Sequence, residues 1–249
     1  MAAAPPQIFS PTRRQAVRRR MMALQQAPDA PRYLHEDVAE DVVERLGFLR
    51  HQPGRVLVLG DAAGTIEQAL RPLGAEIAAD PAFALEQPWP VGGLDLIVVA
   101  FALDTANDLP GALVHARMAL ALGGLLLATM LGAGSLPALR AIMLAADGER
   151  PAPRLHPQVD VRAAAQLLQR AGFTDPVADS RSLTVRFSRL PRLVDDLRAQ
   201  GLSSTLVQAG PSLSRSGLAR AQAAFAAMAE ADGRVSERFE LLTLSGWRR

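Results

Sequence analysis

Short apolar runs alternate along the chain with segments in which apolar residues recur every three or four positions. The runs are typical of strands buried in a parallel sheet, and the periodic segments, such as the stripe Val38, Val42 and Leu46, are typical of amphipathic helices. The predicted strands are 55–60, 75–79, 94–100 and 125–130, and the predicted helices are 36–49, 66–73, 107–122 and 136–146. This alternation predicts an α/β fold with a parallel sheet covered on both faces.

The pattern changes after residue 150, where Pro151, Pro153 and Pro157 make an irregular crossing. Apolar and polar residues then alternate over 183–187, which predicts a half-buried strand. The other elements predicted here are helices at 160–171, 190–200 and 217–229 and a last strand at 239–244. Segment 201–216 is rich in Ser and Gly and is predicted to be a mobile connection.

Composition excludes several kinds of chemistry. All 27 basic residues are arginine, and there is no lysine and no cysteine. These absences exclude a Schiff-base lysine, a Walker-type phosphate lysine, disulfides, thiolate nucleophiles and cysteine-ligated metal sites. Because little titrates between neutrality and the range of arginine, the calculated pI of 10.2 overstates a net charge of +2. No nucleic-acid partner is implied.

The basic charge is concentrated at the N-terminus. Residues 1–28 contain no acid and five arginines, namely Arg13, Arg14, Arg18, Arg19 and Arg20. The leader is either an organellar transit peptide, which would place the protein in the mitochondrial matrix, or a basic arm that stays on a cytoplasmic protein. No apolar run reaches the roughly 20 residues that cross a bilayer, so we expect no integral membrane segment.

The candidate site follows the first predicted strand. Ligands of open parallel sheets bind at the carboxyl ends of the strands, and here Gly60 and Gly64 would let the backbone approach a nucleotide-like ligand. Asp80, twenty residues after Gly60, is suited to bind ribose hydroxyls. The same two glycines are also typical of an ordinary turn.

Several further motifs follow one another along the chain. They are Ile8-Phe9-Ser10 followed by arginines, LDLIV at 94–98, NDLPGAL at 107–113, GGLL at 123–126, LLQRAGF at 167–173 and FELLTLSGW at 239–247. With the glycine loop, this layout resembles the class I S-adenosylmethionine-dependent methyltransferases, in the subgroup of the malonyl-carrier methyltransferase of biotin synthesis and the mitochondrial complex I assembly factor.

The resemblance implies a Rossmann-like sheet, mostly parallel with an antiparallel C-terminal strand, and S-adenosylmethionine as cofactor. It implies a protein or small acyl substrate, with arginine hydroxylation in place of methyl transfer in the assembly-factor branch. The expected organisation is a basic arm at 1–34, a core at 35–187, a helical cap over the site at 188–235 and a last core strand at 236–249.

The chain departs from the family pattern in its cofactor loop. Val58 stands where the family has an acid that meets the ammonium group of the cofactor, and Ala62 stands where it has a middle glycine. Asp61 is a candidate for the missing counter-charge. These losses leave open whether the cofactor is still bound.

A second departure is a deletion between Asp80 and Asp95, which are separated by only 14 residues. This length predicts that the third strand of the family and its helix are missing, because both elements cannot fit there. The wall around the adenine would then be left to Phe83, Glu86 and Trp89.

The residues after 94–100 are candidates to meet the substrate. Asp104 and Thr105 replace a His-Trp pair common in the family, and Asn107 follows them. Methyl transfer depends mainly on alignment of donor and nucleophile, so Asp104 and Asn107 are catalytic candidates without a fixed acid–base role. The alternative for each is helix capping. The four histidines lack metal-ligand spacing, so no metal site is expected.

Two functions remain open. The first is an active enzyme, and the second is a catalytically silent protein that keeps the fold and binds a partner, for instance as an assembly factor. Val58, Ala62 and the short segment 81–94 favour the second, whereas Gly60, Gly64 and Asp80 are compatible with both.

Overall fold

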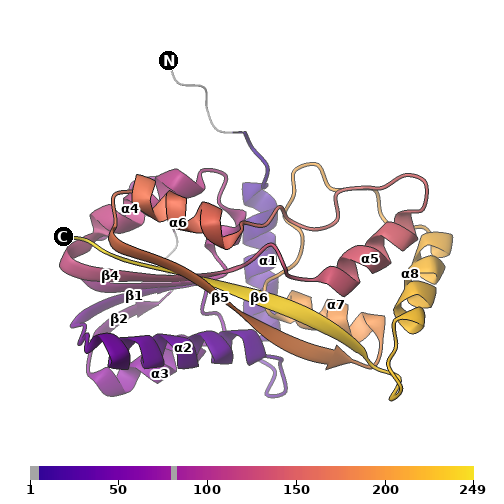
Figure 1. The fold of residues 1–249 in the computed structure, drawn as a ribbon, viewed down its shortest axis with the longest axis horizontal. Coiled ribbons are helices and arrows are strands. Elements are labelled where there is room, and N and C mark those ends of the chain that lie inside the picture. The colour runs from indigo at the N-terminus through magenta and orange to yellow at the C-terminus, as the bar shows by residue number, and fades with distance from the viewer. Residues whose placement is uncertain (1–5, 80–82) are drawn as a thin grey trace.

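The predicted apolar runs lie in one six-stranded sheet with the order β2-β1-β3-β4-β6-β5 (Figure 1). The computed structural model describes residues 6–79 and 83–249. The strands are β1 (Arg55–Leu59), β2 (Glu76–Ala79), β3 (Leu94–Ala100), β4 (Leu120–Leu131), β5 (Thr174–Phe187) and β6 (Val235–Trp247). β6 runs antiparallel to both β4 and β5, and the other pairings are parallel, which confirms the predicted sheet.

Helices cover both faces of the sheet. The helices are α1 (Pro11–Leu24), α2 (Tyr33–Leu49), α3 (Thr65–Leu70), α4 (Leu109–Ala119), α5 (Pro137–Asp147), α6 (Val161–Arg170), α7 (Leu190–Ala199) and α8 (Arg215–Ala227), with short 3-10 turns at Arg71–Leu73 and Leu103–Thr105. α4 and α6 pack with one face of β1, β3 and β4, whereas α2 and α3 pack with the other. No helix in the described residues is long and apolar enough to span a bilayer.

The segment between β2 and β3 is short, as the deletion predicts. Described residues 83–93 contain turns and bends but no strand or helix, and β2 is the edge strand of the described sheet. The third strand of the family pattern and its helix are therefore missing from the described part of the chain.

Several element boundaries differ from those predicted. Helix α4 ends at Ala119 and β4 already begins at Leu120, so Gly123, with a φ of 85°, lies within a strand instead of ending a helix. β5 begins at Thr174, well before the predicted 183–187. Its first half is polar and half-exposed on an edge strand, so it lacks the alternation that marks a strand in the sequence.

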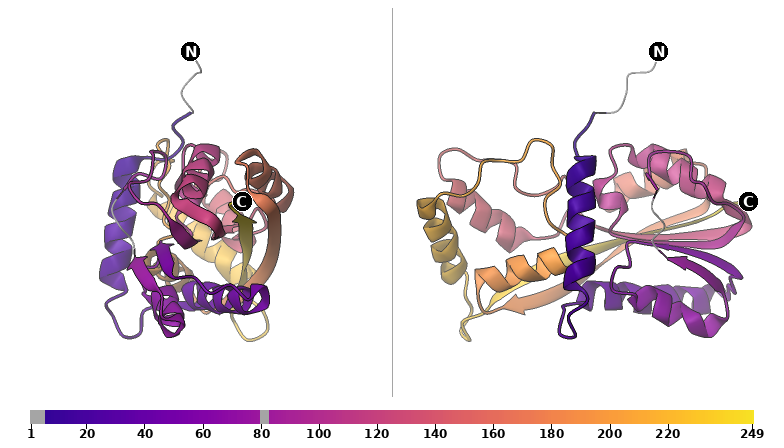
Figure 2. Two further views of the ribbon diagram at one scale, coloured as in Figure 1. Left: turned by 90° about the vertical axis from the view of Figure 1, so that its left-hand side faces the viewer. Right: turned by 180° about the vertical axis from the view of Figure 1, so that it is seen from behind.

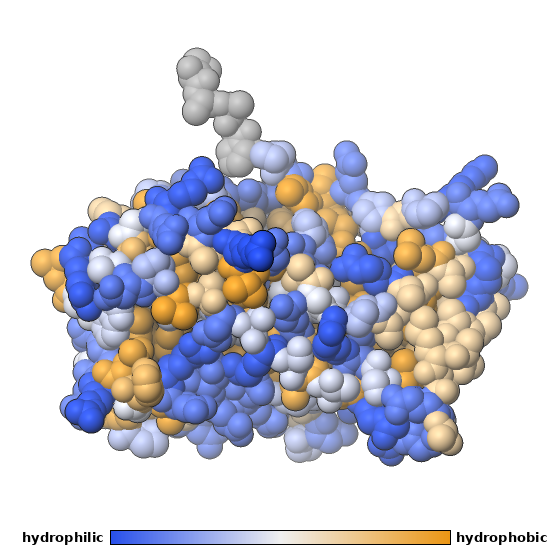
Figure 3. All heavy atoms as spheres, in the orientation of Figure 1, coloured by the Kyte–Doolittle hydropathy of each residue, from blue (hydrophilic) through white to orange (hydrophobic). Residues whose placement is uncertain are grey.

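A second apolar cluster surrounds the far ends of β5 and β6. α5, α7 and α8 pack there around Phe187, Phe239 and Leu241. The predicted cap at 188–235 supplies α7 and α8, and α5 joins them from outside that range. On the face shown in Figure 3, charged residues are interspersed with apolar ones, and the pale orange area at the right lies over the alanine-rich α8.

The basic leader contains a helix that is tied to the body. Ser10 caps the N-terminus of α1, where its Oγ accepts a hydrogen bond from the Arg13 amide. Figure 2 shows α1 crossing the boundary between the sheet and the second cluster. The predicted mobile segment 201–216 is irregular but bonded to the leader, since the Ser10 amide donates to Thr205 O and the Val207 amide donates to Ile8 O.

Candidate functional site

Two adjoining pockets open at the carboxyl ends of β1, β3 and β4. The first, here called the arm pocket, has a volume of about 550 Å³ and lies between α1, residues 83–86 and the ends of β1 and β3. The second, the cap pocket, has a volume of about 500 Å³ and lies among α5, α7, α8 and residues 154–158. Phe101, Thr105 and Gly201 line both pockets, so the two spaces share a wall.

Gly60 forms the floor of the arm pocket where β1 ends. Its φ is 85°, and a Cβ atom built there would lie 1.9 Å from the Ala100 carbonyl oxygen. Only glycine therefore fits at this position, because the end of β3 occupies the space of a side chain, and Gly60 contributes backbone atoms alone to the pocket lining.

His35, at the start of α2, is a buried polar group beside Gly60. Its Nε2 lies 3.2 Å from the Gly60 carbonyl oxygen, and burial lowers the pKa of His35 to about 4, so the imidazole is neutral. Because Nε2 donates its hydrogen to that carbonyl, Nδ1 is an acceptor. Nδ1 is buried and has no hydrogen-bond partner in the described residues, and the same holds for the side-chain amide nitrogen of Gln200, which also lines the arm pocket.

Glu86 and Arg14 form an ion pair that links the arm pocket to α1. Arg14 Nη1 lies 2.6 Å from Glu86 Oε1, and that oxygen also accepts a hydrogen bond from the Asn107 amide at 3.1 Å. Burial alone would raise the pKa of Glu86, but the hydrogen bonds from Arg14 and Asn107 outweigh it, and the pKa lies below its usual value. Glu86 is therefore an ionised group on the pocket wall.

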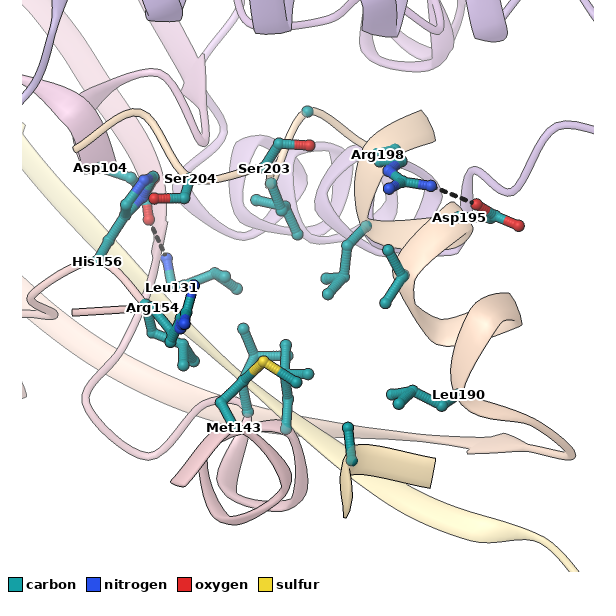
Figure 4. Close-up of a pocket in the computed structure, with 18 of the residues that line it drawn as sticks. Asp104, Leu131, Met143, Arg154, His156, Leu190, Asp195, Arg198, Ser203 and Ser204 are labelled. Atoms are coloured by element: carbon teal, nitrogen blue, oxygen red, sulfur yellow. Dashed lines mark hydrogen bonds and ion pairs between the residues drawn. The ribbon is translucent and has the colours of Figure 1, made fainter. Parts of the chain in front are cut away.

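Asp104 lies on the wall of the cap pocket, directly beside Thr105 on the shared wall (Figure 4). Its Oδ1 accepts a hydrogen bond of 2.7 Å from the Leu131 amide, whereas its Oδ2 is buried without a partner in the described residues. Burial raises the pKa of Asp104 to about 7. This carboxyl group can accordingly accept or release a proton near neutral pH.

Phe101 holds an unusual backbone conformation at the shared wall. Its φ of 54° is in the left-handed region, which is strained for an aromatic residue. The Phe101 amide donates to the Thr129 carbonyl at 2.8 Å, and its ring meets the His35 ring edge-on at 5.4 Å. Strain of this kind persists where the surrounding structure fixes it, and it is often found at functional sites.

Comparison with known proteins shows which family the chain belongs to. No protein-family profile matches the chain. The malonyl-acyl-carrier-protein O-methyltransferase of Halorhodospira halophila is 31% identical, in an alignment that covers 94% of this chain and 88% of that enzyme. The chain belongs to the class I methyltransferase family.

Another relative and a solved structure extend the comparison. The human mitochondrial arginine-hydroxylase NDUFAF5 is 27% identical over 91% of this chain and 73% of its own length. The crystal structure of Burkholderia thailandensis 1,6-didemethyltoxoflavin-N1-methyltransferase, with S-adenosylhomocysteine bound, matches with a TM-score of 0.52 at 14% identity, covering 100% of this chain and 94% of that one. This structural match shows a shared fold.

Val58 occupies the loop position at which the resemblance predicts an acid, and Asp61 is used elsewhere in the structure. Both oxygens of Asp61 accept hydrogen bonds from the first turn of α3, Oδ1 from the Thr65 amide at 3.0 Å and Oδ2 from the Glu67 amide at 2.8 Å. Asp61 caps α3 and does not line the arm pocket, so its proposed contact with the cofactor ammonium is not supported. Val58 is fully buried among apolar residues of α2 and α3.

The remaining cofactor candidates divide between the pocket wall and its support. Phe83 and Glu86 line the arm pocket as expected, but Trp89 does not. The Trp89 ring lies 5.1 Å from that of Phe83, and its Nε1 donates to Leu85 O, so it supports the wall from the core. Gly64, with a φ of 69°, begins α3 outside the pocket lining. Asp80 lies outside the described residues.

Asn107 contacts the leader and lines neither pocket. Its Oδ1 accepts from the amides of Ile8 and Phe9 at 2.8 Å each, and its Nδ2 donates to Phe9 O. The helix cap expected from Asn107 is made by Asp108, whose Oδ1 accepts from the Gly111 amide. The polar groups of Asn107 are thus used to hold the leader, and a direct contact with substrate is not supported.

The sequence reasoning missed His35, Gln200 and His156 as site residues. They lie at the start of α2, just after α7 and in an irregular segment, and only tertiary folding brings them to the pockets. The proline-rich stretch before His156 was the one available signal for a loop at the site. The described residues contain no cluster of three or more His, Asp or Glu side chains that could hold a metal ion.

Proposed function

We propose that this protein binds S-adenosylmethionine in the arm pocket and transfers its methyl group to a substrate in the cap pocket. The shared wall of Phe101, Thr105 and Gly201 carries this proposal, because methyl transfer requires donor and acceptor in adjoining spaces. Membership in the methyltransferase family supports the choice of cofactor.

The residues of the arm pocket fit this cofactor in kind. Gly60 contributes backbone atoms alone to the lining, Phe83 offers an apolar ring to the adenine, and the buried polar atoms of His35 and Gln200 that lack partners are suited to the amino-acid end of the cofactor. Asp80 remains the predicted partner of the ribose hydroxyls. When bound, S-adenosylmethionine supplies an electrophilic methyl group, whose transfer leaves a thioether.

Asp104 is the candidate proton acceptor. Its free Oδ2 and its pKa of about 7 suit it to take the proton that a hydroxyl or amine nucleophile loses as it is methylated. Phe101 lines both pockets, so it would lie beside the donor and the acceptor of the methyl group. The names of the relatives mention a malonyl group on an acyl-carrier protein and an arginine, so a carrier-bound acyl group and a protein arginine are the candidate substrates, and a role in complex I assembly stays a prediction.

A second candidate is a catalytically silent binding or assembly protein. It is favoured by one observation, namely that Val58 is buried and apolar while Asp61 is committed to α3, so no acid of the loop remains for the cofactor ammonium. In that case the arm pocket would be a remnant and the surface would carry the function.

Calorimetric titration with S-adenosylmethionine and S-adenosylhomocysteine separates the two candidates. We expect micromolar binding, weakened about tenfold by Phe83→Ala through loss of stacking. Phe48→Ala, which removes an exposed ring on α2, is the matched control and should bind as the wild type does. Absence of heat at millimolar ligand from a cooperatively folded sample would instead establish the silent protein.

A further inference from the structure

The cap pocket is mainly aliphatic. Its lining includes Leu139 and Met143 of α5, Leu190, Val194 and Leu197 of α7, and Leu218 of α8. A volume of about 500 Å³ falls within the roughly 300–1,000 Å³ of pockets that bury small organic ligands. In Figure 4 Asp104, His156 and Ser204 lie at one end of the pocket, and Asp195 and Arg198 lie at the other.

The two cations of the pocket are already neutralised. Arg154 donates to Asp147 through Nε and to the Pro211 carbonyl through Nη1. Arg198 forms an ion pair with Asp195 at 2.9 Å. The pocket therefore offers no unpaired guanidinium to a carboxylate ligand.

The polar end of the pocket has an unmatched acceptor. His156 accepts a hydrogen bond from the Thr205 amide at 2.8 Å, and burial lowers its pKa to about 4, so it is neutral. Asp104 has no cation beside it among the described residues, and its Oδ2 is buried without a donor. A buried acceptor without a donor is costly, and a ligand that brings an N–H or O–H group removes that cost.

From these contacts we propose that the cap pocket binds a small molecule with an aliphatic body and an amine or hydroxyl head, the head bonded to Asp104 and the body between α5, α7 and α8. A carboxylate head is disfavoured because it would meet Asp104 with no free arginine to offset the repulsion. This ligand differs in charge from a malonyl group. Its role as the methylated substrate rests on the proposed function, but its binding does not.

Titration calorimetry without cofactor tests the proposal, with octylamine, octanol and octanoate as probes at a pH above the pKa of Asp104. Octylamine and octanol should bind, and octanoate should bind about tenfold or more weakly, as loss of a hydrogen bond to a charged group implies. Asp104→Asn should weaken the binding of octylamine and reduce the difference in affinity between octylamine and octanoate. Asp29→Asn, at an exposed site, is the matched control.

Filling the aliphatic part provides an independent variant. Val194→Trp should abolish binding of all three probes while the circular dichroism of the protein stays unchanged. Equal affinity for octylamine and octanoate in the wild type, or no probe binding to a folded sample, would overturn the proposal. If octylamine binds but S-adenosylmethionine gives no heat, the pocket assignment stands and the proposed methyl transfer fails.

Discussion

Gly60 lines the arm pocket at a point where the ends of β1 and β3 are in close contact. The position lacks space for a side chain because the Ala100 carbonyl oxygen occupies it, and its φ of 85° is disfavoured for other residues. Gly64 has a similar φ of 69°, but nothing lies within 4 Å of a Cβ atom built there. Gly60 therefore combines a strained φ with a steric clash for any side chain, whereas Gly64 has the strained φ alone.

Alanine at these two positions should have unequal effects. Gly60→Ala combines strain with a backbone clash and is expected to cost about 3 kcal/mol or more of unfolding free energy, whereas Gly64→Ala costs about 1 kcal/mol. Urea unfolding followed by circular dichroism measures both. Equal losses would mean that the contact between Gly60 and Ala100 does not constrain the loop.

Asp104 should leave a signature in the pH dependence of stability. Burial raises its pKa from 3.8 to about 7, so between these values the folded chain holds a proton that the unfolded chain has lost. The free energy of unfolding contributed by this group therefore falls as the pH rises from about 4 to about 7. Asp104→Asn removes this dependence. As the pH rises across that range, the free energy of unfolding of the variant should therefore increase by about 1–3 kcal/mol relative to that of the wild type.

Urea unfolding of both proteins at about pH 5 and about pH 8 measures this difference. The contributions of His35 and His156 are common to both proteins and cancel in the comparison. Parallel pH profiles would show that the carboxyl group of Asp104 is not perturbed in solution.

Ala62 is a smaller defect than its place in the glycine loop indicates. It does not line the arm pocket, whereas the missing third strand removes a whole wall from the described structure. Ala62→Gly alone should therefore change the affinity for S-adenosylmethionine by less than about threefold, a difference of under 1 kcal/mol. Calorimetry of this variant tests whether the missing third strand weakens cofactor binding more than Ala62 does. Tight binding by Ala62→Gly alone would show that Ala62 is the larger defect.

At the scale of elements, α1 is held as a wall of the arm pocket by contacts at both ends. Asn107 binds the backbone of Ile8 and Phe9 before the helix, and Gln25 donates to the Ala199 carbonyl after it. The ion pair of Arg14 and Glu86 lies between these anchors.

Asn107→Ala should loosen the front of this wall. Two amides and one carbonyl lose their partner, so the amides of Ile8 and Phe9 should exchange with solvent at least about tenfold faster. Hydrogen exchange read by mass spectrometry measures this, and Asn107→Asp, which keeps the acceptor, should have the smaller effect. Unchanged exchange would mean that the bridge between Phe9 and Leu206 holds the leader by itself.

The elements that the sequence predicted best are those whose patterns arise from burial on both sides. β3 was predicted at its observed bounds, and the missing third strand was predicted from the family pattern and the short segment between Asp80 and Asp95. The edge strand β5 was predicted short because its polar half is held by backbone pairing with β6, which side-chain patterns do not record. At the site, Gly60 could be placed from its motif, whereas the role of Asp61 depended on the direction of its side chain.

At the scale of the whole molecule, β5 and β6 join the apolar packing of the sheet to the second cluster. Both strands run from the sheet beneath α6 to the cluster around α5, α7 and α8. Arg181 and Arg45 reinforce the connection through ion pairs between β5 and α2. β5 and β6 thus contribute side chains both to the sheet core and to the second cluster.

We expect the sheet and the second cluster to unfold together. Trp89 and Trp247 report on the sheet, whereas much of the helical signal comes from the second cluster, so unfolding followed by tryptophan fluorescence and by far-ultraviolet circular dichroism should give the same midpoint. Separate midpoints would show that the cap is an independent cooperative unit.

The wall formed by α1 has a consequence for timing. A ligand of the arm pocket that must wait for this helix to move would associate at a rate that rises with concentration and then reaches a plateau, the plateau being the opening rate of the helix. Turnover would then be governed by the contacts that hold α1 in place, among them the hydrogen bonds between the Asn107 side chain and the backbone of Ile8 and Phe9. The opening rate of α1 would then limit the rate of the reaction.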